Sequence, residues 1–537
     1  MDRLKHLQQL QKNLVFDLVI IGGGATGCGV ALDAASRGLK VALVEKNDFA
    51  EGTSSRSTKL VHGGVRYLEM AVKKLDRVQY NLVRDGLRER YTLLNNAPHL
   101  SNRLSLVTPL YRWIDLPYVF SGLKLYDILA GKRNIGHSRL LSRKEALRRF
   151  PTLKAEGLKG GVLYYDGQFH DARMALGLAL TAEEHGAVIV NHVEVTGLIK
   201  EDGRISGANV RDSITGNSWP LKARGVINAT GPFADQIRKL DNPAAANILS
   251  ASTGIHIVLD KRFAPPDTGL MIPETEDGRV LFVLPWEEHA LVGTTDEPAE
   301  ITEHPRPLDT EISYLLRHVS RYFNLQVEKS DVKAAWSGLR PLVSDPRAVD
   351  TARLARDHVI EESNSGLLTI AGGKWTTYRK MALDTVDHAL NLFNLSPPKA
   401  CQTETLPILG SAGYSDDGAS VLAARYDLSL DVANYLYRTY GDQAERVAEL
   451  AKEGYGSRLV NGHPVLEAEV LYAVRHELAE RVIDILTRRM PLALLDTAAA
   501  RTATPRVLEL MAAELGWDQQ RCQEEKTLTN LRLTVAL

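Results

Sequence analysis

The chain has 537 residues, 44% of them hydrophobic, which is enough for two or three domains with a sizeable buried core. Lys+Arg (65) and Asp+Glu (66) balance to a formal net charge of -1, so composition gives no indication of a nucleic-acid partner, and any anion site must be a local cluster of cations. Cys28, Cys401 and Cys522 are far apart and form no CxxC pair, which predicts a reducing compartment, no disulfide and no metal site.

The amino-terminal residues 1–14 are charged from the third position and lack the apolar core of a secretory signal. The longest uncharged run, Leu18 to Leu32, is too short to span a bilayer and contains five glycines. We therefore expect no transmembrane helix, and any membrane contact should be peripheral. The leucines of residues 4–14 predict a small amphipathic helix, a pattern more typical of a helix packed on the protein than of an anchor.

A βαβ unit is predicted near the amino terminus. Residues 18–21 form a continuous apolar strand, an alanine-rich helix follows as far as Arg37, and a second strand covers residues 41–44. A glycine-rich turn joins the first strand to the helix. This order of strand, glycine-rich turn, helix and strand predicts a dinucleotide-binding fold.

The turn fits the GxGxxG fingerprint in the place where that motif binds a dinucleotide. Gly22 permits the tight turn, Gly24 lets a pyrophosphate approach the backbone, and Gly27 lets helix and strand pack closely. Glu45, at the end of the second strand, suits the ribose hydroxyls of an adenosine and disfavours the 2′-phosphate of NADP. The motif by itself does not distinguish NAD from FAD.

The middle of the chain predicts further strands. Residues 186–212 predict a β-hairpin that turns at EDGR, and residues 225–231 predict a buried strand that ends in glycine. Residues 250–345 contain IHIVLD, RVLFVLPW and HALVGTTD and predict an antiparallel sheet that covers the substrate. Residues 366–390 return to the order strand, glycine pair, helix.

The carboxy-terminal part predicts helices. Residues 395–418 contain three prolines and three glycines, and we expect a linker there. Residues 465–490 then predict a long helix with one apolar face. That face consists of Val470, Val474, Leu478, Val482 and Leu486. A helical carboxy-terminal domain is therefore expected.

Two later segments favour FAD over NAD. In VINATGPFADQI, the turn at 229–231 stands where a flavoprotein passes its backbone near the dinucleotide. In IAGGKWTTYRKMA, Gly372 and Gly373 stand at a helix amino terminus with Lys374 beside them, which is a place for negative charge. A reduced flavin carries its charge around N1 and O2, where such a terminus and an ammonium group would stabilise it.

Eight short motifs together carry a resemblance to a known family. They are IGGGATGCG, TSSRSTKLVHGGVRYLE, NATGPFAD, GIHIVL, VGTTD, SGLRPL, GGKWTTYR and VRHELAERVIDILTRR, between about residue 15 and residue 490. In this order they closely resemble the FAD-dependent glycerol-3-phosphate dehydrogenases, the respiratory, quinone-linked enzymes. The resemblance implies oxidation of sn-glycerol 3-phosphate to dihydroxyacetone phosphate, with electrons passed to membrane quinone.

The resemblance also implies the fold. It is an α/β fold with a Rossmann-like FAD-binding domain of the D-amino-acid-oxidase type, an antiparallel β-sheet substrate domain and a C-terminal α-helical domain. We expect a discontinuous FAD-binding domain at 1–100, 150–250 and 345–395, a substrate-binding domain at 101–149 and 251–344, a linker at 396–418 and a helical domain at 419–537.

Oxidising a secondary alcohol on a flavin needs a hydride acceptor, a base for the hydroxyl proton and cations for the phosphate. Arg66, Arg340 and Lys374 are the candidate cations, and arginine suits phosphate because its planar fork donates two parallel hydrogen bonds. The family context makes Arg66 and Arg340 the expected substrate ligands. Tyr67 and Thr295 are second-line candidates.

His256 is the candidate base, because histidine titrates near working pH and the GIHIVL strand is expected to end near the flavin. His62 is the rival, although the glycines Gly63 and Gly64 beside it suggest close backbone packing against the flavin. The expected catalytic residues are His256, Arg340 and Lys374.

Residues 53–69 are too polar for a core, and we expect them to join two anion sites. The hydroxyls at 53–55 should face the cofactor pyrophosphate, residues 59–64 should run along the isoalloxazine, and Arg66 and Tyr67 should emerge on the substrate side. The expected cofactor-binding residues are Gly22, Gly24, Ala25, Thr26, Gly27, Glu45, Lys46, Thr53, Ser54, Ser55, Thr58, Lys59, Leu60, His62, Gly63, Gly64, Val195, Ala229, Thr230, Gly231, Gly373, Lys374, Trp375 and Thr376.

Three other functions compete with a quinone-linked dehydrogenase. A glycerol-3-phosphate oxidase shares these motifs and passes electrons to oxygen, but the oxidases tend to carry an extra insertion, and this chain looks compact. A flavin amine oxidase would need a carboxylate site, and the clustered arginines argue against it. A non-catalytic FAD-binding sensor would bind the cofactor without being reduced by glycerol 3-phosphate.

The resemblance further implies where the protein acts. The expected location is cytoplasmic, at the inner face of the cell membrane, with glycerol 3-phosphate and quinone as partners and no nucleic acid. The amino-terminal leucines and the basic pair Arg488 and Arg489 are candidate points of membrane contact. A homodimer is a candidate assembly.

Overall fold

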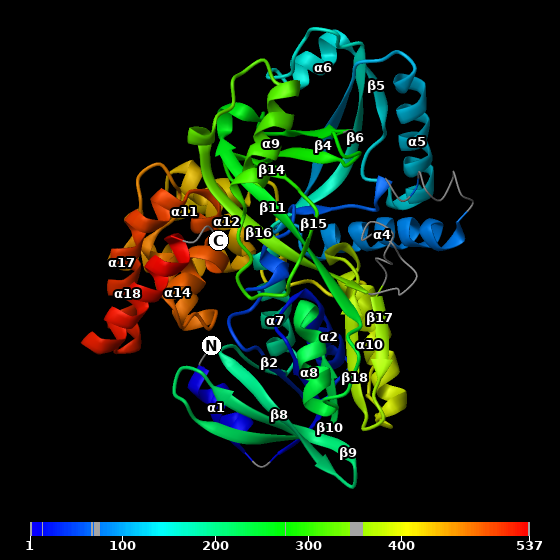
Figure 1. Cartoon of the computed structure of the whole chain (residues 1–537). Coiled ribbons are helices and arrows are strands. Elements are labelled where there is room, and N and C mark those ends of the chain that lie inside the picture. Colours follow the sequence, from blue (N-terminus) through cyan, green and yellow to red (C-terminus); the bar gives the residue numbers. More distant parts are fainter. Residues whose placement is uncertain are drawn as a thin grey trace.

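Two β-sheets and a carboxy-terminal group of helices make up the fold in the computed structural model (Figure 1). The structure describes residues 3–12, 14–65, 68, 76–273, 275–343 and 358–534. In Figure 1 the first sheet lies in the lower half, the second sheet lies above it, and the last helices, in orange and red, lie on the left. The architecture is therefore the expected α/β fold with a second sheet and a helical end.

The expected βαβ unit begins the first sheet. β1 (Val15–Ile21) and β2 (Val41–Val44) run parallel and are joined by α2 (Ala25–Ser36). Alternate residues of β1 enter two different buried clusters, one on each face of the sheet. Because both faces are covered, the strand has a continuous apolar sequence without alternation.

Further strands extend this sheet on both sides. Its parallel strands are, in spatial order, β18 (Leu367–Gly372), β10 (Ser218–Asn228), β1, β2 and β7 (Val188–Val190). An antiparallel β17 (His358–Glu362) lies beside β18. The predicted hairpin is confirmed: β8 (Val193–Glu201) and β9 (Arg204–Asp212) pair across Asp202 and Gly203, both of which have positive φ.

The second sheet is mostly antiparallel. Its strands are, in spatial order, β15 (Glu297–Ala299), β11 (Leu249–Asp260), β14 (His289–Gly293), β13 (Leu281–Trp286), β12 (Thr268–Ile272), β4 (Ser101–Leu110), β6 (Gly160–Phe169) and β3 (Leu60–Val61), with β16 (Val332–Val343) paired to β11 and β5 (Arg139–Ser142) paired to β6. The β12–β4 pair is parallel.

The expected boundary at residue 150 does not match this topology. It grouped β6 with the first sheet, but β6 pairs along its whole length with β4 and also pairs with β3 and β5. An apolar strand has the same periodicity whichever partner it takes, so the sequence pattern could not identify the sheet to which β6 belongs.

Helices cover the first sheet. α2, α7 (Asp171–Glu184) and α10 (Tyr378–Leu392) share one buried cluster with β1 and β2. The amino-terminal α1 (Arg3–Gln11) buries Leu7 and Leu10 in the cluster on the other face. The predicted amphipathic helix therefore packs on the protein, and these two leucines are not available to a membrane.

The remaining helices surround the second sheet and form the carboxy-terminal group. They are α4 (Arg77–Asn96), α5 (Asp115–Ala130), α6 (Arg143–Arg149), α9 (Asp309–Tyr322), α11 (Gly418–Tyr426), α12 (Leu430–Tyr440), α13 (Ala444–Leu450), α14 (Glu467–His476), α15 (Val482–Asp484), α16 (Leu492–Leu495), α17 (Thr497–Leu515) and α18 (Gln519–Thr534). The short α8 (Ala234–Asp241) instead packs against β8, β10 and β18 of the first sheet. The late helices share a buried cluster with Trp286 and Trp336 of the second sheet. None of the described helices combines the length and the apolar sequence needed to cross a membrane.

The long helix expected at residues 465–490 is interrupted, so this prediction is wrong in its middle. α14 ends at His476, and Leu478 adopts a left-handed backbone with φ 54°. The carbonyl groups released by the break accept hydrogen bonds from other parts of the chain, that of Glu477 from Arg489 (2.7 Å) and that of Leu478 from Asn191 (2.8 Å). Tertiary partners therefore replace helical hydrogen bonds here.

Candidate functional site

A cavity of about 560 Å³ opens at the carboxyl ends of β1, β2 and β10. Ligands of open parallel sheets bind at these ends, and the volume is within the usual range for a small-molecule site. The lining segments come from both sheets, since Pro341 of β16 and Glu303 also border the cavity. The cavity therefore extends from the glycine turn toward the second sheet.

The glycine turn has the geometry that its sequence predicts. Gly22 has φ 108°, and a side chain there would meet the carbonyl oxygen of Ala229 at 2.7 Å. A Cβ at Gly27 would lie 1.8 Å from the carbonyl oxygen of Gly22, so helix and strand pack too closely for any other residue. Gly24 caps α2 without a side-chain hydrogen bond. The amino terminus of α2 thus keeps N–H donors available for an anion.

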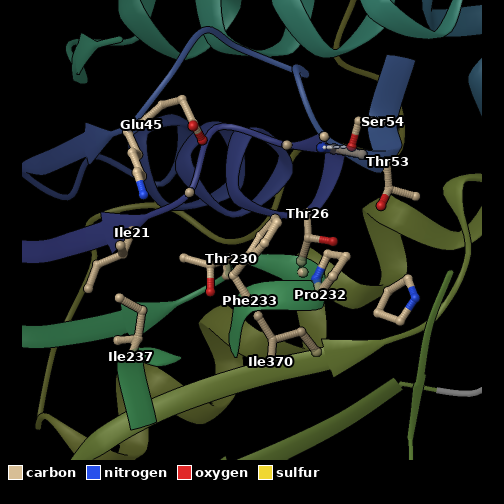
Figure 2. A pocket seen from close by; sticks show the side chains of 18 of the residues that line it. Ile21, Thr26, Glu45, Thr53, Ser54, Thr230, Pro232, Phe233, Ile237 and Ile370 are labelled. Carbon is tan, nitrogen blue, oxygen red and sulfur yellow. Dashed lines mark hydrogen bonds between the residues drawn. The ribbon is translucent and has the colours of Figure 1, made fainter. Parts of the chain in front are cut away.

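Glu45 and Ser54 hold this turn from two sides (Figure 2). The Glu45 carboxylate accepts hydrogen bonds from the backbone N–H of Gly23 (2.6 Å) and of Asn47 (2.9 Å). The hydroxyl of Ser54 accepts one from the backbone N–H of Ala25 at 2.9 Å. Burial raises the pKa of Glu45 to about 6, although the two backbone donors oppose this shift.

Most of the expected cofactor residues line the cavity. These are Gly22, Gly24, Ala25, Thr26, Glu45, Lys46, Thr53, Ser54, Val195, Ala229, Thr230, Gly231, Gly373, Lys374 and Trp375. The other expected cofactor residues are not among those that line this cavity. These are Gly27, Ser55, Thr58, Lys59, Leu60, His62, Gly63, Gly64 and Thr376.

One wall of the cavity was missed by the sequence analysis. Phe233, Gln236, Ile237 and Leu240 lie at i, i+3, i+4 and i+7 and present one face of α8 to the cavity. Figure 2 shows Phe233 and Ile237 with Ile370 on the side of the cavity away from Glu45. The helical spacing after NATG could have identified this wall.

Lys59, which we expect with residues 60–64 along the isoalloxazine, does not line this cavity. Its side chain is fully buried, and Nζ pairs with Asp171 at 2.7 Å and donates to the carbonyl oxygen of Ser55 at 2.6 Å. Burial lowers the pKa of Lys59, while Asp171 opposes this. An ammonium group in this environment already has its counter-ion, and its charge holds the polypeptide together.

The strand, glycine pair and helix at 367–392 meet the first glycine turn. Gly372 and Gly373 both have positive φ, and a Cβ at Gly373 would meet the sulfur of Met381 at 2.4 Å. The indole N–H of Trp375 donates to the carbonyl oxygen of Ser54 at 2.9 Å. This contact brings Lys374 to the same cavity as the glycine turn.

His256 lies on β11 in a buried aromatic environment. Its ring stacks on Trp336, with centroids 4.3 Å apart, and its Nε2 is 2.9 Å from the hydroxyl of Thr58. Burial lowers the pKa of His256 well below its usual value, and the charges of Lys59 and Arg340 act in the same direction. The imidazole is therefore neutral at physiological pH. Its Nδ1 has no hydrogen-bond partner among the described residues.

Arg340 reaches toward His256 from the adjacent strand β16. Its guanidinium pairs with Asp296 at 3.1 Å and donates to the carbonyl oxygen of Thr295 at 2.9 Å. A Cβ at Gly254 would lie 2.2 Å from a guanidinium nitrogen, so the absence of a side chain there lets Arg340 cross β11. The structure thus brings two of the expected catalytic residues together on neighbouring strands.

The other expected substrate ligands are placed differently. The hydroxyl of Thr295 is buried, donates to Glu311 at 2.8 Å and accepts from the backbone N–H of Ile255 at 3.0 Å. A hydroxyl engaged on both sides is a weak candidate for a ligand contact. Arg66 and Tyr67 lie outside the described residues.

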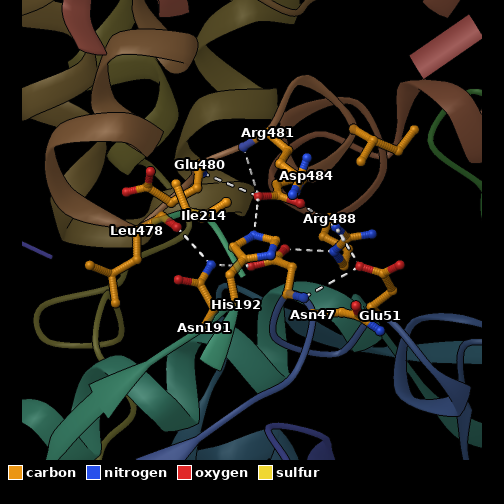
Figure 3. A network of polar contacts seen from close by, with 12 residues as sticks. Asn47, Glu51, Asn191, His192, Ile214, Leu478, Glu480, Arg481, Asp484 and Arg488 are labelled. Carbon is orange, nitrogen blue, oxygen red and sulfur yellow. Dashed lines mark hydrogen bonds and ion pairs between the residues drawn. The ribbon is translucent and has the colours of Figure 1, made fainter. Parts of the chain in front are cut away.

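A buried ionic network joins the loop after β2 to the carboxy-terminal helices (Figure 3). Asp48 accepts hydrogen bonds from Arg488 (2.6 Å) and Arg489 (2.7 Å), and His192 contacts Asp484 at 2.9 Å. Burial opposes ionisation of Asp48, but the two guanidinium groups hold its pKa well below its usual value. Arg488 and Arg489 are thus buried, and the prediction that they could contact a membrane is wrong.

Comparison with protein families matches nearly the whole chain. Residues 17–379 match the model of the family described as FAD dependent oxidoreductase. Residues 401–522 match the model described as the C-terminal domain of alpha-glycerophosphate oxidase.

Curated relatives carry consistent names. The chain is 49% identical over 535 residues to a Caenorhabditis elegans protein named probable glycerol-3-phosphate dehydrogenase, mitochondrial, with 97% of this chain and 74% of the relative covered. It is 47% identical over 537 residues to the human glycerol-3-phosphate dehydrogenase, mitochondrial, with the same coverage of 97% and 74%. An Arabidopsis thaliana relative is 47% identical over 530 residues, with 95% and 84% covered.

Solved structures agree with this grouping. The glycerol-3-phosphate dehydrogenase from Bacillus halodurans, solved in complex with FAD, has a TM-score of 0.81 and 30% identity, covering 99% of this chain and 97% of that one. The L-alpha-glycerophosphate oxidase from Mycoplasma pneumoniae has a TM-score of 0.56 and 17% identity, covering 73% and 98%, and therefore supports the fold alone.

Proposed function

Because the chain belongs to the FAD-dependent glycerol-3-phosphate dehydrogenase family, we propose that it oxidises sn-glycerol 3-phosphate to dihydroxyacetone phosphate and passes the electrons to a membrane quinone. The observation that carries this proposal is a cation and a neutral imidazole on adjacent strands, Arg340 on β16 and His256 on β11. A phosphate and a neighbouring hydroxyl need this pair. The bound flavin supplies the hydride acceptor.

The residues around the cavity fit FAD. The amino terminus of α2, with the bare backbone of Gly24, would receive the pyrophosphate. Glu45 would accept hydrogen bonds from the ribose hydroxyls of the adenosine. Gly373 and Lys374, at the other end of the lining, would lie toward the isoalloxazine, where a positive charge favours the reduced ring.

Arg340 is the proposed ligand of the substrate phosphate. A guanidinium offers two parallel donors to a phosphate, and the ion pair with Asp296 at 3.1 Å would keep these donors oriented before the substrate binds. Arg340 is followed on β16 by Pro341, which lines the cofactor cavity. The phosphate would thus be held next to the flavin end of the cavity.

His256 is the proposed base. Burial and the nearby charges of Lys59 and Arg340 keep its ring unprotonated, so it can accept the hydroxyl proton as the hydride leaves. The hydroxyl of Thr58 engages Nε2, and stacking on Trp336 fixes the plane of the ring. The ring nitrogen that faces the bound substrate would accept the proton of its hydroxyl group.

Variants of these two residues separate binding from chemistry. Arg340→Met should raise KM at least tenfold while FAD stays bound, because it removes phosphate ligands and no cofactor contact. His256→Asn should lower kcat by roughly 10²- to 10⁴-fold with FAD retained. The comparison variant is His62→Asn, because His62 is the rival candidate for the base. If that variant lost turnover while His256→Asn kept it, the base would be His62.

A direct test of the reaction class uses the bound flavin. Anaerobic addition of glycerol 3-phosphate should bleach the oxidised flavin spectrum of the purified holoenzyme within the turnover time. A flavin that stays oxidised would rule out both the dehydrogenase and the oxidase and would leave a non-catalytic FAD-binding protein.

Oxygen is the alternative electron acceptor. The carboxy-terminal match to a domain described from alpha-glycerophosphate oxidase keeps it open, whereas relatives at 47–49% identity are named dehydrogenases. Reoxidation of the reduced enzyme should be much faster with a short-chain ubiquinone analogue than with air-saturated buffer. The reverse order would make the protein an oxidase.

Support for membrane contact comes from α5 and the residues that precede it. Trp113 and Ile114 are 69% and 72% exposed, and Ile128 on the same helix is also exposed. Lys132 and Arg133 follow the helix and are exposed to solvent. Exposed apolar side chains before the helix and at Ile128, with basic side chains after its end, suit the surface of an anionic bilayer. We propose this region as the membrane-facing surface that gives access to quinone.

A further inference from the structure

Three potential metal ligands from separate segments meet between the second sheet and the carboxy-terminal helices. His289 begins β14, His463 precedes α14, and Asp496 immediately precedes α17. One candidate ligand atom of each side chain lies within 4.8 Å of the others. The two imidazole rings are nearly parallel, with centroids 5.7 Å apart.

The turn before His289 fixes which nitrogen of its ring is available. Trp286 and His289 pair across Glu287 and Glu288, which have φ 46° and 57°, the pattern of a tight hairpin turn. Nδ1 of His289 lies 2.6 Å from the carbonyl oxygen of Glu287. Because a carbonyl only accepts, Nδ1 donates in this contact, which leaves Nε2 as the ring nitrogen that can bind a metal. Metal-binding histidines are commonly oriented by this kind of contact.

Asp496 is held by the helix that follows it. One carboxylate oxygen accepts a hydrogen bond from the backbone N–H of Ala499 at 3.0 Å and caps α17. The other lies 3.5 Å from the ammonium of Lys333, whose side chain is 43% exposed. The capped carboxylate is therefore oriented, while the lysine beside it can move into solvent when another cation arrives.

His463 completes the donor set, with its ring nearly parallel to that of His289. Among the described residues, no hydrogen bond joins the side chains of His289, His463 and Asp496 to one another. Two imidazoles and one carboxylate thus converge without a hydrogen bond to one another.

We propose that His289, His463 and Asp496 form a binding site for a divalent transition-metal cation, for which Zn²⁺ is the best match. Two imidazole nitrogens and one carboxylate oxygen are preferred ligands of Zn²⁺, and the fourth position would hold water. Tetrahedral coordination needs ligand atoms roughly 3.3 Å apart. Both histidines are partly exposed, so small side-chain rotations can close the present separation.

A second triad of potential metal ligands in the described chain already has its negative charge balanced by the protein. Asp48, His192 and Asp484 also converge and are fully buried. There Arg488 and Arg489 already donate to Asp48, so positive charge occupies the position that a metal would take. At the His289 cluster, the neighbouring cation is the half-exposed Lys333, which approaches a single oxygen.

Metal binding here would join the β13–β14 hairpin to the start of α17. A ligand that binds only the folded chain raises its stability in proportion to occupancy. The proposal does not depend on the oxidation of glycerol 3-phosphate, and none of its three residues lines the cofactor cavity. It is therefore testable independently of the activity.

The experiment titrates ZnCl₂ into the EDTA-treated, desalted holoenzyme by calorimetry. We expect one zinc site per chain, weakened at least tenfold by His289→Gln, by His463→Gln and by Asp496→Asn. Asn retains the capping ability of Asp, so Asp496→Asn removes the charge without removing the cap of α17. Lys333→Gln should tighten binding, because it removes the competing ammonium. The control is His137→Gln, which replaces an exposed histidine that is distant in sequence from the three proposed ligands.

A second measurement keeps the result independent of folding defects. Each variant should retain the flavin absorbance and circular dichroism of the parent protein. Zinc should raise the thermal unfolding midpoint of the parent, of His137→Gln and of Lys333→Gln, but not that of the three ligand variants. Zinc binding by His463→Gln and His289→Gln with parental affinity and stoichiometry would overturn the proposal. Absence of zinc binding by the parent protein would overturn it too.

Discussion

At the scale of one residue, we expect Glu45 to couple FAD binding to pH. Burial raises the pKa of its carboxyl group from an ordinary 4.5 to about 6. The folded cofactor-free chain therefore holds this proton more tightly than the unfolded chain. Stability contributed by the protonated group is present at low pH and is lost as pH rises from 4.5 through about 6, at a cost of about 2 kcal/mol.

FAD binding should reverse this preference, because ribose hydroxyls donate most strongly to an ionised carboxylate. We expect the dissociation constant of FAD to increase several-fold as pH falls below about 6. Fluorescence titration of the cofactor-free protein at about pH 5 and about pH 7.5 measures this. Glu45→Gln should bind FAD more weakly and without this pH dependence. An unchanged pH dependence in that variant would mean that another group titrates.

Ser54 and Ser55 differ in what they contact, although the sequence predicts the same role for both. Ser54 lines the cavity and accepts from the N–H of Ala25, whereas Ser55 is buried away from it. Ser54→Ala should therefore weaken FAD binding by about 1 kcal/mol, or roughly fivefold. Ser55→Ala is the matched control and should bind FAD normally. If Ser55→Ala lost more FAD affinity than Ser54→Ala, Ser55 would contact the cofactor as the sequence predicts.

At the scale of elements, the segment after α14 decides how the carboxy-terminal helices meet the first sheet. Arg489 is fully buried, and its guanidinium contacts the carboxylate of Asp48 and the carbonyl oxygen of Glu477. The same contacts stabilise the break in the expected helix at 465–490. A position that periodicity assigns to a helix surface thus becomes the joint between two parts of the fold.

Arg489→Met should remove one of the two guanidinium groups that balance the charge of the buried Asp48 carboxylate. Removing one partner of a buried ion pair costs on the order of 3 kcal/mol, so the midpoint of thermal unfolding should fall by several degrees. The control is Arg88→Met, which breaks a surface pair with Glu404 and should cost less than about 1 kcal/mol. Equal losses in the two variants would mean that the buried network contributes no more than a surface pair.

At the scale of the whole molecule, the proposed membrane-facing surface consists of α5 and the residues that flank it, which do not line the cofactor cavity. The double variant Trp113→Ser with Ile114→Ser should reduce binding to anionic vesicles in a sedimentation assay several-fold. Turnover with a soluble dye acceptor should stay normal. Leu430→Ser, which removes an exposed leucine of α12, should bind vesicles like the parent protein. Equal vesicle binding by the double variant would place the contact elsewhere.

The parts that the sequence predicted are those set by neighbours along the chain. β1, α2 and β2 follow from hydrophobic runs and from the glycines between them, because the turn needs small residues wherever the fold is used. The position of Glu45 at the end of β2 follows from the same unit. The chemistry of histidine suggested His256 and the family resemblance suggested Arg340, and the two residues lie on adjacent strands.

Tertiary structure decided which side chains remained available for function. Lys59 has the sequence context of a cofactor contact, but Asp171, more than a hundred positions away, takes its charge. Arg488 and Arg489 look like a basic surface in the sequence, but Asp48 draws them into the interior. Local sequence specifies turns, strands and helices because their hydrogen bonds are local. The partner of a charge or of a strand is chosen by burial across long separations, which no local pattern encodes.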